Sequence, residues 1–431
     1  MSGLLGSLHT ASSGMRANQT VIQTINHNIT NMNTPGYTRQ RAELSANRAN
    51  ATPGRNTSGI YAGQLGQGAS VSSITRIRNS FYDNQYRAES HNYGNAAIKY
   101  DQFSNIENIF NEPSDTSISS TLNNFFDSFN ELSKNPDSTS AKKYVVEKAQ
   151  LLTNVLNQTV QKLDGLKTDI ATQEETTIND VNRILKELET LEKEIKIVEA
   201  TGKNPNDLLD RKDNLIDELS FKVNINNTDV KNALSDGTLT SAEIANLDVS
   251  GELQANKDMQ KEIDAIIGDI TTFMNAFAEK FNDTYTHVQS PQNAKRMFTI
   301  GRDANGLVTI SMNKAFTDDP ASLNMTSDLA LTLSGIKSAK VNINGENITL
   351  GNFYNSIVQD IGYATQSVGR ELANRESLMV NLESSKASIS GVSLDEEMIN
   401  LMQFQHAYNA TAKVASTIDS LLDVVINGII R

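Results

Sequence analysis

Histidine, glycine and aspartate are the residue types in this chain whose spacing could support chemistry. No histidine stands three or four residues from another, so a helix would not bring two of them together as metal ligands. The five histidines are His9, His27, His91, His287 and His406. Three glycines between residues 63 and 68 resemble a phosphate-binding loop only superficially, because no Lys-Ser or Lys-Thr pair follows them. We interpret the histidines as solvated or contact residues and the glycines as part of a turn.

An acidic cluster between residues 207 and 218 is the second feature of chemical interest. Its members are Asp207, Asp210, Asp213, Asp217 and Glu218. Two basic residues, Arg211 and Lys212, are interleaved, which favours a solvated, salt-bridged helix face over a cation site. The absence of cysteine excludes a disulfide framework, a thiolate nucleophile and cysteine-ligated metals. The sequence therefore predicts no catalytic, cofactor-binding or metal-binding residues, and a protein that is not an enzyme.

Composition narrows the class of protein further. The 431 residues carry 38 Lys plus Arg against 51 Asp plus Glu, a formal net charge of −13, which is unfavourable for binding nucleic acid. No stretch of about eighteen apolar residues is present, so we expect no membrane insertion. Residues 1–20 lack a basic segment followed by a continuous apolar core, so we expect no cleaved signal peptide. With 7 prolines, 6% aromatics and a mean hydropathy of −0.40, the chain is typical of long helices with one wet face.

Heptad spacing at both chain ends predicts the elements that matter most. In the N-terminal segment, apolar residues recur every seven positions and form a stripe along a helix of about 30 residues. The stripe contains Leu8, Met15, Ile22, Ile25 and Ile29. The sequence Thr34-Pro35-Gly36 then ends the helix, because proline lacks a donor and glycine adopts turn geometry freely.

The C-terminal segment mirrors this pattern from Ser393 onward, where Glu396 completes a predicted capping box. Its seam residues are Leu394, Leu401, Phe404, Tyr408, Ile418, Leu422, Val425 and Ile429. Glu397 is the only charged residue in this seam, so we expect its replacement by alanine to be harmless. The two ends are complementary coiled-coil partners, and together they form the predicted assembly interface.

The middle of the chain reads mostly as helix. Helical patterns cover residues 81–110, 141–170, 181–198, 206–219, 252–287 and 350–388. Two hairpins are predicted at 297–312 and 341–350, and residues 69–78 alternate like an edge strand. The predicted fold is mainly α: a long coiled-coil-like helical bundle built from both chain ends, with small outer domains that contain β-hairpins.

The same pattern suggests a division of the chain into three parts. Residues 1–40 and 391–431 form a terminal coiled-coil assembly domain. Residues 41–220, 252–289 and 351–390 form a helical core, and residues 221–251 and 290–350 form a reduced outer β-containing region. We expect the ends to be disordered in the dilute monomer, because an isolated helix is marginal in water, and the core to fold alone. Leu422 would then lie outside the monomer core.

Residues 25–39 carry a specific resemblance. Their asparagine-rich helix end leads into Asn33, Thr34, Pro35, Gly36 and Tyr37, and this segment resembles the N-terminal signature of bacterial flagellar rod, hook and hook-associated proteins. Residues 66–87 and 391–413 are similar to the continuation of that signature and to its C-terminal counterpart. Residues 206–219 and the long helical middle favour the hook-associated members, which implies a structural subunit at the junction between hook and filament.

The resemblance also implies partners and a location. The partners would be further copies of the chain in a tubular lattice, the hook protein, a second hook–filament junction protein and an export chaperone at the C-terminal helix. The location would be extracellular, in the bacterial flagellum. Three alternatives stay open: another axial component such as a hook or rod protein, a cell-wall hydrolase on a flagellar scaffold, and a coiled-coil signalling module. A hydrolase would need a pair of carboxylates in a cleft.

Overall fold

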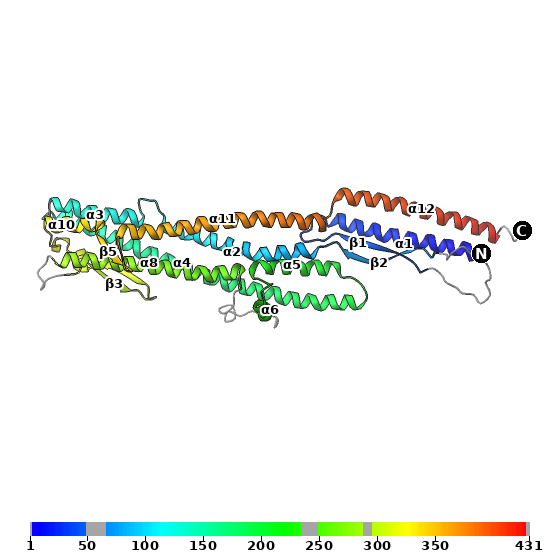
Figure 1. Cartoon of the computed structure of the whole chain (residues 1–431), viewed down its shortest axis with the longest axis horizontal. Coiled ribbons are helices and arrows are strands. Elements are labelled where there is room, and N and C mark those ends of the chain that lie inside the picture. Colours follow the sequence, from blue (N-terminus) through cyan, green and yellow to red (C-terminus); the bar gives the residue numbers. More distant parts are fainter. Residues whose placement is uncertain (1, 49–65, 235–248, 288–294, 428–431) are drawn as a thin grey trace.

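The computed structural model describes residues 2–48, 66–234, 249–287 and 295–427. It confirms a mainly α fold, drawn out into a long, narrow molecule with both termini at one end (Figure 1). The long helices are α1 (Ser2–Thr30), α2 (Ser80–Phe110), α3 (Ile118–Lys134), α4 (Thr139–Ala200), α5 (Asn206–Lys222), α8 (Gly251–His287), α11 (Leu350–Ser390) and α12 (Leu394–Asn427). Short helices are α6 (Thr228–Leu234), α9 (Lys314–Asp318) and α10 (Ser327–Gly335).

The described strands form three separate antiparallel pairs. They are β1 (Gln40–Ala46) with β2 (Ala69–Arg76), β3 (Phe298–Arg302) with β4 (Val308–Met312), and β5 (Lys340–Ile343) with β6 (Glu346–Thr349). The two later hairpins were predicted. The predicted strand at 69–78 is present as β2. It pairs with β1, a strand that the sequence did not reveal. A two-stranded ribbon is marginal by itself, and this one packs along α1.

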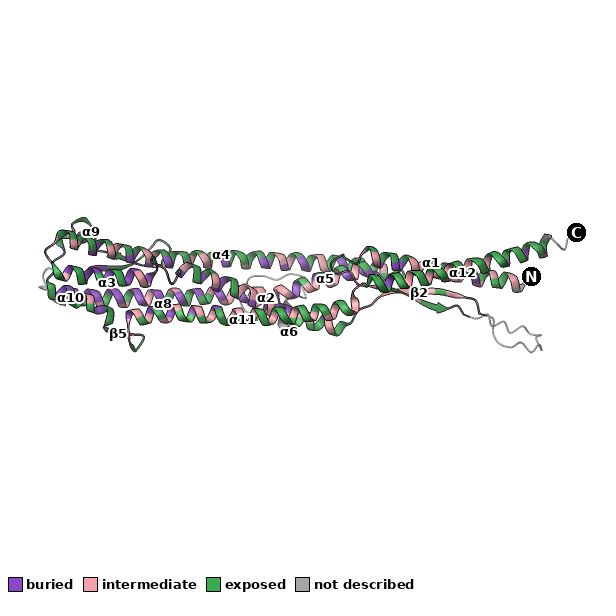
Figure 2. Ribbon diagram, turned by 90° about the horizontal axis from the view of Figure 1, so that it is seen from above, coloured by how far each residue is buried: buried purple, intermediate pink, exposed green. Residues whose placement is uncertain are grey.

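One continuous core fills the part of the rod far from the termini. It joins buried residues of α2, α3, α4, α8 and α11, and Figure 2 shows them as purple stripes facing one another. Phe125, Phe277, Phe281 and Phe298 form edge-on and tilted ring pairs with centroids 5.0 to 6.0 Å apart. Such pairs add to the stabilisation that apolar burial already gives.

The predicted outer region at 290–350 shares this core. Met297, Phe298 and Ile310 of the first hairpin and Leu333 of α10 are buried in it. Asn157 of α4 also brackets strand β4, donating to the Ile310 carbonyl at 2.8 Å and accepting from its amide at 2.9 Å. The two hairpins and the long helices therefore belong to one packed body.

A second, smaller core lies nearer the termini, between α4, α5 and the start of α8. Val223 caps α5 in extended conformation and is fully buried here beside Val249. The Asn224 amide donates to the Val249 carbonyl at 2.8 Å, and α6 follows as a helix where the sequence suggested an outer β region. Residues 235–248 and most of the glycine-rich segment 53–68 lie outside the described residues.

The terminal section is defined here as α1, α12 and the β1–β2 ribbon. The ribbon packs on α1, whereas its sequence position suggested that residues 41–76 belong to the helical core. We call the remaining helices and hairpins, from α2 to α11, the rod.

Candidate assembly interface

The predicted seam joins α1 to α12 within a single chain. Ile25, Ile418 and Leu422 are buried in it, and the helices approach so closely that a Cβ on Gly14 would lie 3.3 Å from Thr411 Cγ2. The half-buried members are Leu8, Met15, Ile22, Ile29, Leu401, Phe404, Tyr408 and Val425. Leu394 is 44% exposed, and Ile429 lies outside the described residues.

This burial changes the expectation for Leu422. Leu422 belongs to neither apolar cluster of the rod, but it is only 8% exposed because α12 packs along α1. It is thus a core residue of the terminal section of the monomer. The sequence also missed Ala17 and Val21, which are buried on α1 outside the heptad stripe.

A second face of α12 leaves large apolar side chains in solvent. These side chains are Met398, Ile399, Met402, Val414, Leu421 and Val424, which are between 44% and 66% exposed. They lie off the seam, so the heptad pattern did not single them out. Apolar patches of this kind mark surfaces that bind other proteins.

The signature residues form the turn that connects α1 to β1. The Tyr37 amide donates to the Thr34 carbonyl at 3.1 Å, with Pro35 and Gly36 at the two central positions. Gly36 has φ +74°, as the third residue of a type II turn requires. A Cβ at Gly36 would also lie 2.1 Å from the Asn214 side chain of α5, which would have to move to make room. Asn33 is exposed beside the turn.

A buried hydrogen-bond cluster fixes this turn to both terminal helices. Asn28 of α1, which is 1% exposed, donates to the Gln40 carbonyl at 2.9 Å and to Glu397 Oε2 at 3.1 Å. Its Oδ1 accepts from the Gln40 amide at 3.0 Å and from the Tyr37 hydroxyl at 2.8 Å. Burial, and then the nearby carboxylates of Asp207 and Asp210, raise the pKa of Tyr37, so its hydroxyl stays protonated.

Glu397 therefore has a role that the heptad pattern did not suggest. The residue is 3% exposed. Its carboxylate accepts a hydrogen bond from Asn28 and lies 3.8 Å from Arg39 Nε. A buried charge costs free energy unless it is paired and hydrogen-bonded, and here both conditions hold. The expectation that Glu397 is a dispensable intruder in the seam is wrong, because this carboxylate links α12 to α1 and to the turn.

Replacing Glu397 by alanine is expected to loosen the terminal section. The Asn28 amide would lose a partner, at a cost of about 1–3 kcal/mol for a buried unsatisfied donor. Limited proteolysis should then cleave α12 faster than in the wild type, whereas Glu396→Ala, at a 61% exposed side chain, should change this rate less. Equal rates for Glu397→Ala and wild type would contradict the linking role.

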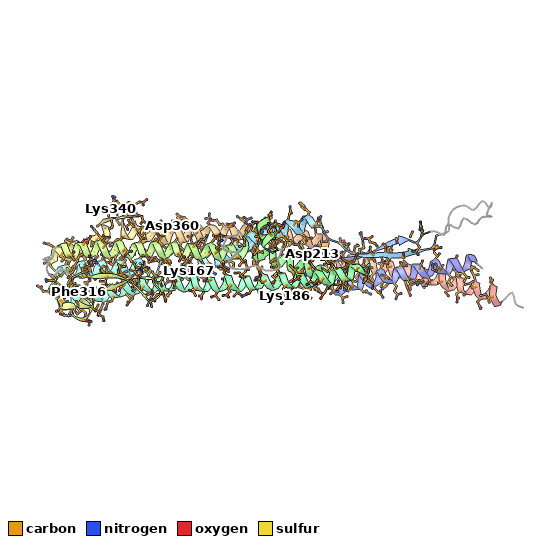
Figure 3. All side chains as sticks on the ribbon, turned by 90° about the horizontal axis from the view of Figure 1, so that it is seen from below. Lys167, Lys186, Asp213, Phe316, Lys340 and Asp360 are labelled. Atoms are coloured by element: carbon orange, nitrogen blue, oxygen red, sulfur yellow. The ribbon has the colours of Figure 1, made fainter. Side chains whose placement is uncertain are left out.

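The acidic face of α5 meets basic residues from β2, α2 and the loop between them. Asp213 pairs with Arg76 at 2.8 Å, Arg78 at 2.8 Å and Arg87 at 3.0 Å. Asp217 adds pairs with Arg87 at 2.6 Å and with Lys386 of α11. Figure 3 shows Asp213 near the boundary between rod and terminal section.

This network corrects the prediction of a solvated face. The side chains of Asp213 and Arg78 are only 18% and 13% exposed. Burial alone would raise the pKa of Asp213, but the guanidinium groups of Arg78, Arg76 and Arg87 outweigh it and hold that pKa below its ordinary value. Arg211, Lys212 and Glu218, on the other side of α5, behave as predicted and pair with Glu187, Glu192 and Arg183 of α4.

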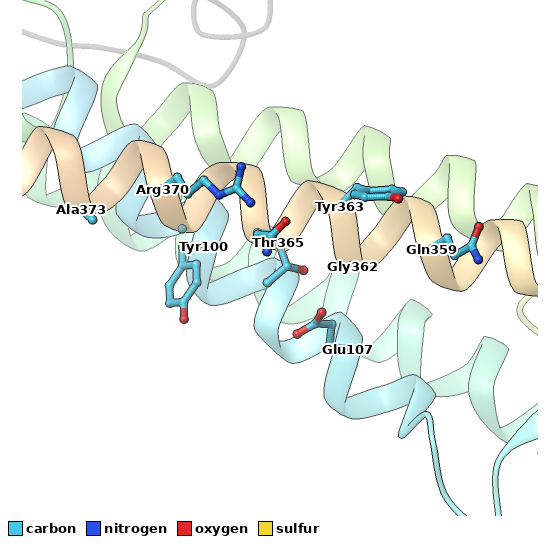
Figure 4. A pocket seen from close by; sticks show the side chains of 10 residues that line it. Tyr100, Glu107, Gln359, Gly362, Tyr363, Thr365, Arg370 and Ala373 are labelled. Carbon is cyan, nitrogen blue, oxygen red and sulfur yellow. The ribbon is translucent and has the colours of Figure 1, made fainter.

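A surface hollow between α2 and α11 offers little for catalysis. It measures about 840 Å³ and is wide open. Figure 4 shows its lining, in which Glu107 is the one carboxylate beside Tyr100, Tyr363 and Arg370. This hollow lacks the carboxylate pair that a cell-wall hydrolase would need. Within the described ranges, no group of three acidic or histidine side chains could hold a metal ion, and no helix has the length and apolarity of a membrane span.

Known proteins resemble this chain along nearly its whole length. A protein of Bacillus subtilis (strain 168) called flagellar hook-associated protein 1 is 30% identical over 98% of this chain and 97% of its own length. The chain belongs to the flagellar hook-associated protein 1 family. A relative of the same name from Escherichia coli (strain K12) is 25% identical over 97% of this chain and 99% of its own.

Matches to family profiles and to a solved structure agree with this assignment. The profile of the FlgK helical domain matches residues 103–240, and profiles of basal body rod proteins match residues 8–38 and 384–428. The flagellar hook junction protein FlgK from Burkholderia pseudomallei has the same fold, with a TM-score of 0.58 at 13% identity over 71% of this chain and all of that one. The chain is therefore a structural component of the bacterial flagellum. Among the alternatives that the sequence left open, the hook-associated type is the one that these matches support.

Proposed function

We propose that this chain is a structural subunit at the junction between the flagellar hook and the filament, and that it assembles there through its terminal helices. The observation that carries the proposal is the exposed apolar face of α12, opposite the face that packs on α1. In a tubular lattice this face would be covered by neighbouring subunits. Each fully buried Leu, Ile or Met side chain would contribute about 1.5–3 kcal/mol, repeated around the ring.

The exposed apolar face supports self-association, because head-to-tail contacts between copies of one chain build rings and helical tubes. We infer the hook protein on one side and a second hook–filament junction protein on the other from what membership of the family implies. Before assembly, the apolar face of α12 would expose the subunit to aggregation. An export chaperone bound to α12 would cover it.

The proposal extends to location and activity. The subunit would be exported and would work outside the cell, as a load-bearing joint rather than as an enzyme. Its net charge of −13 suits a solvated protein surface and disfavours nucleic acid as a partner. The candidate assembly residues are then the exposed apolar side chains of α12, supported by the seam beneath them.

A lysine at Met402 is expected to block incorporation without unfolding the chain. Met402 is 51% exposed, so the variant should keep the melting temperature of the wild type. In the lattice, the lysine would have to be desolvated against a neighbour, which is unfavourable without a partner charge. Cosedimentation with isolated hooks should fall at least tenfold.

The control is Thr332→Lys, at an exposed polar position of α10, away from the terminal helices. It adds the same charge and should cosediment like the wild type if the apolar residues of α12 carry the contact. Normal binding of the Met402→Lys variant, or equal loss in both variants, would argue against assembly through this face.

A further inference from the structure

The two apolar cores of the rod are separate clusters, with a gap between them along the same helices. On α4 the larger cluster ends at Ile170 and the smaller one begins at Ile178. On α8 the gap lies between Leu253 of the smaller cluster and Met259 of the larger one. A helix that packs along a bundle normally continues its apolar stripe through such positions, so the buried residues in the gap need a reason of their own.

Three buried polar side chains lie at this level of the rod, and we call them the polar layer. They are Gln102 of α2, Thr177 of α4 and Asn256 of α8, which are 7%, 6% and 0% exposed. Gln102 Nε2 donates to Gln173 Oε1 of α4 at 3.2 Å, and Thr177 Oγ1 donates to the Gln173 carbonyl at 3.0 Å. These two members of the layer are therefore bonded within the bundle.

Asn256 differs from the other two members. Neither its Oδ1 nor its Nδ2 has a hydrogen-bond partner among the residues that the structure describes. In the same residues, no other buried side chain is left with both a free donor and a free acceptor. A buried amide without hydrogen bonds costs free energy, so nearly all such groups in folded proteins bond to protein atoms or to ordered water.

The Asn256 side chain points into the bundle. Residues three apart on a helix share a face, so Asn256 lies on the same face of α8 as Leu253 and Met259, which are both buried in the cores. This face packs against α2 and α4. A long side chain such as lysine can reach bulk solvent from a buried position, but the short asparagine side chain cannot.

Polar contacts on either side of Asn256 keep the three helices together. Asp258 of α8 pairs with Lys99 of α2 at 2.8 Å. Gln260 of α8 donates to Glu174 of α4 at 2.6 Å. Bulk solvent therefore does not reach the Asn256 amide unless these contacts break.

The chemistry of the amide selects its ligand. The group can accept two hydrogen bonds and donate two, which water matches because water also does both. A metal ion would need several oxygen ligands, and Asn256 offers one. An internal water also needs two to four polar partners. Gln102 Oε1 accepts one bond, from Asn105 at 3.3 Å, and Thr177 Oγ1 donates one, so both keep acceptor capacity.

We propose that Asn256 is a binding site for internal water inside the rod. The bound water completes the hydrogen bonds of the polar layer and fills the level at which the two apolar cores are separated. The site is a property of the single chain and does not depend on the proposed assembly surface.

A crystal structure of the full chain, at a resolution that shows ordered water, tests the site without any substitution. We expect a water oxygen about 3 Å from Oδ1 or Nδ2 of Asn256. An Asn256 side chain bonded only to protein groups, or one with no water beside it, would overturn the proposal.

Oxygen-17 relaxation dispersion tests the same site in solution, because it counts water molecules that stay bound for longer than the protein takes to tumble. Asn256→Leu replaces the amide by an apolar side chain of similar size. We expect this variant to keep the helical circular dichroism of the wild type and to lose at least one long-lived water. Asn179→Leu, the same change at an exposed position of α4, is the matched control and should lose none.

Two results in solution would contradict the site. A folded Asn256→Leu variant with as many long-lived waters as the wild type would show that Asn256 binds none of them. An equal loss in Asn179→Leu would show that the change does not come from the polar layer. If Asn256→Leu does not fold, the crystal structure of the wild-type chain decides the question.

Discussion

Replacing Leu422 by aspartate is expected to abolish motility while leaving the rod folded. Leu422 is buried between α12 and α1, so the new carboxylate must be desolvated or the helix pair must open, at a cost of several kcal/mol. Because neither apolar cluster of the rod includes Leu422, the melting temperature of the rod should hardly change. The cells should make the protein but release flagellin into the medium without a filament.

Thr332→Asp is the control for this prediction, since it adds the same charge at an exposed position of α10, away from both terminal helices. It should swim normally and resist protease like the wild type. In Leu422→Asp, limited proteolysis should remove the terminal helices quickly and stop at the rod. A Leu422→Asp strain that swims normally would refute assembly through the terminal helices, and loss of the rod transition would show that the terminal section and rod fold as one unit.

Replacing Asp213 by alanine is expected to destabilise the rod near its boundary with the terminal section. Three guanidinium groups lose one partner each in a site that is largely shielded from water. Breaking a buried ion pair costs about 3–5 kcal/mol; partial exposure, and the second partners that Arg76, Arg78 and Arg87 retain, reduce this to about 2–3 kcal/mol. Urea unfolding followed by circular dichroism measures the change in the free energy of unfolding.

The pH dependence of this difference has a defined sign. The pKa of Asp213 is lowered in the folded chain, so its contribution is fully present above the ordinary aspartate pKa of about 3.9 and is lost as pH falls through the folded value. The stability gap between wild type and variant should stay constant from neutral pH to mildly acidic pH and shrink below about pH 4. Glu189→Ala, which removes an exposed ion pair with Lys193, should show no gap at any pH.

The long helices could be predicted because their apolar period is visible within short windows of sequence. Residues 81–110 and 252–287 match α2 and α8 closely, and the two predicted hairpins are present. The partner strand of the ribbon was missed because Gln40–Ala46 is short and largely polar, with most of its side chains in solvent. Its strand conformation depends on pairing with β2 and packing on α1, neither of which is encoded locally.

The polar part of the site was beyond sequence reasoning for a similar reason. The arginines that neutralise Asp213 precede it by more than 120 residues, so the acidic helix looked solvated when read alone. Asn28 and Glu397 are 369 positions apart, and only the pairing of the two chain ends brings them together. A heptad pattern predicts which side chains face a partner helix, but not which charged residue inside the seam is satisfied.

Immunogold labelling of detached hook–filament complexes tests the central claim most directly. An epitope inserted between Asn344 and Gly345, in the exposed turn between β5 and β6, would leave the terminal helices unchanged. The account predicts a single band of gold where hook and filament meet, and no band in cells that carry the Leu422→Asp variant. Gold spread along the hook, or confined to the basal body, would contradict it.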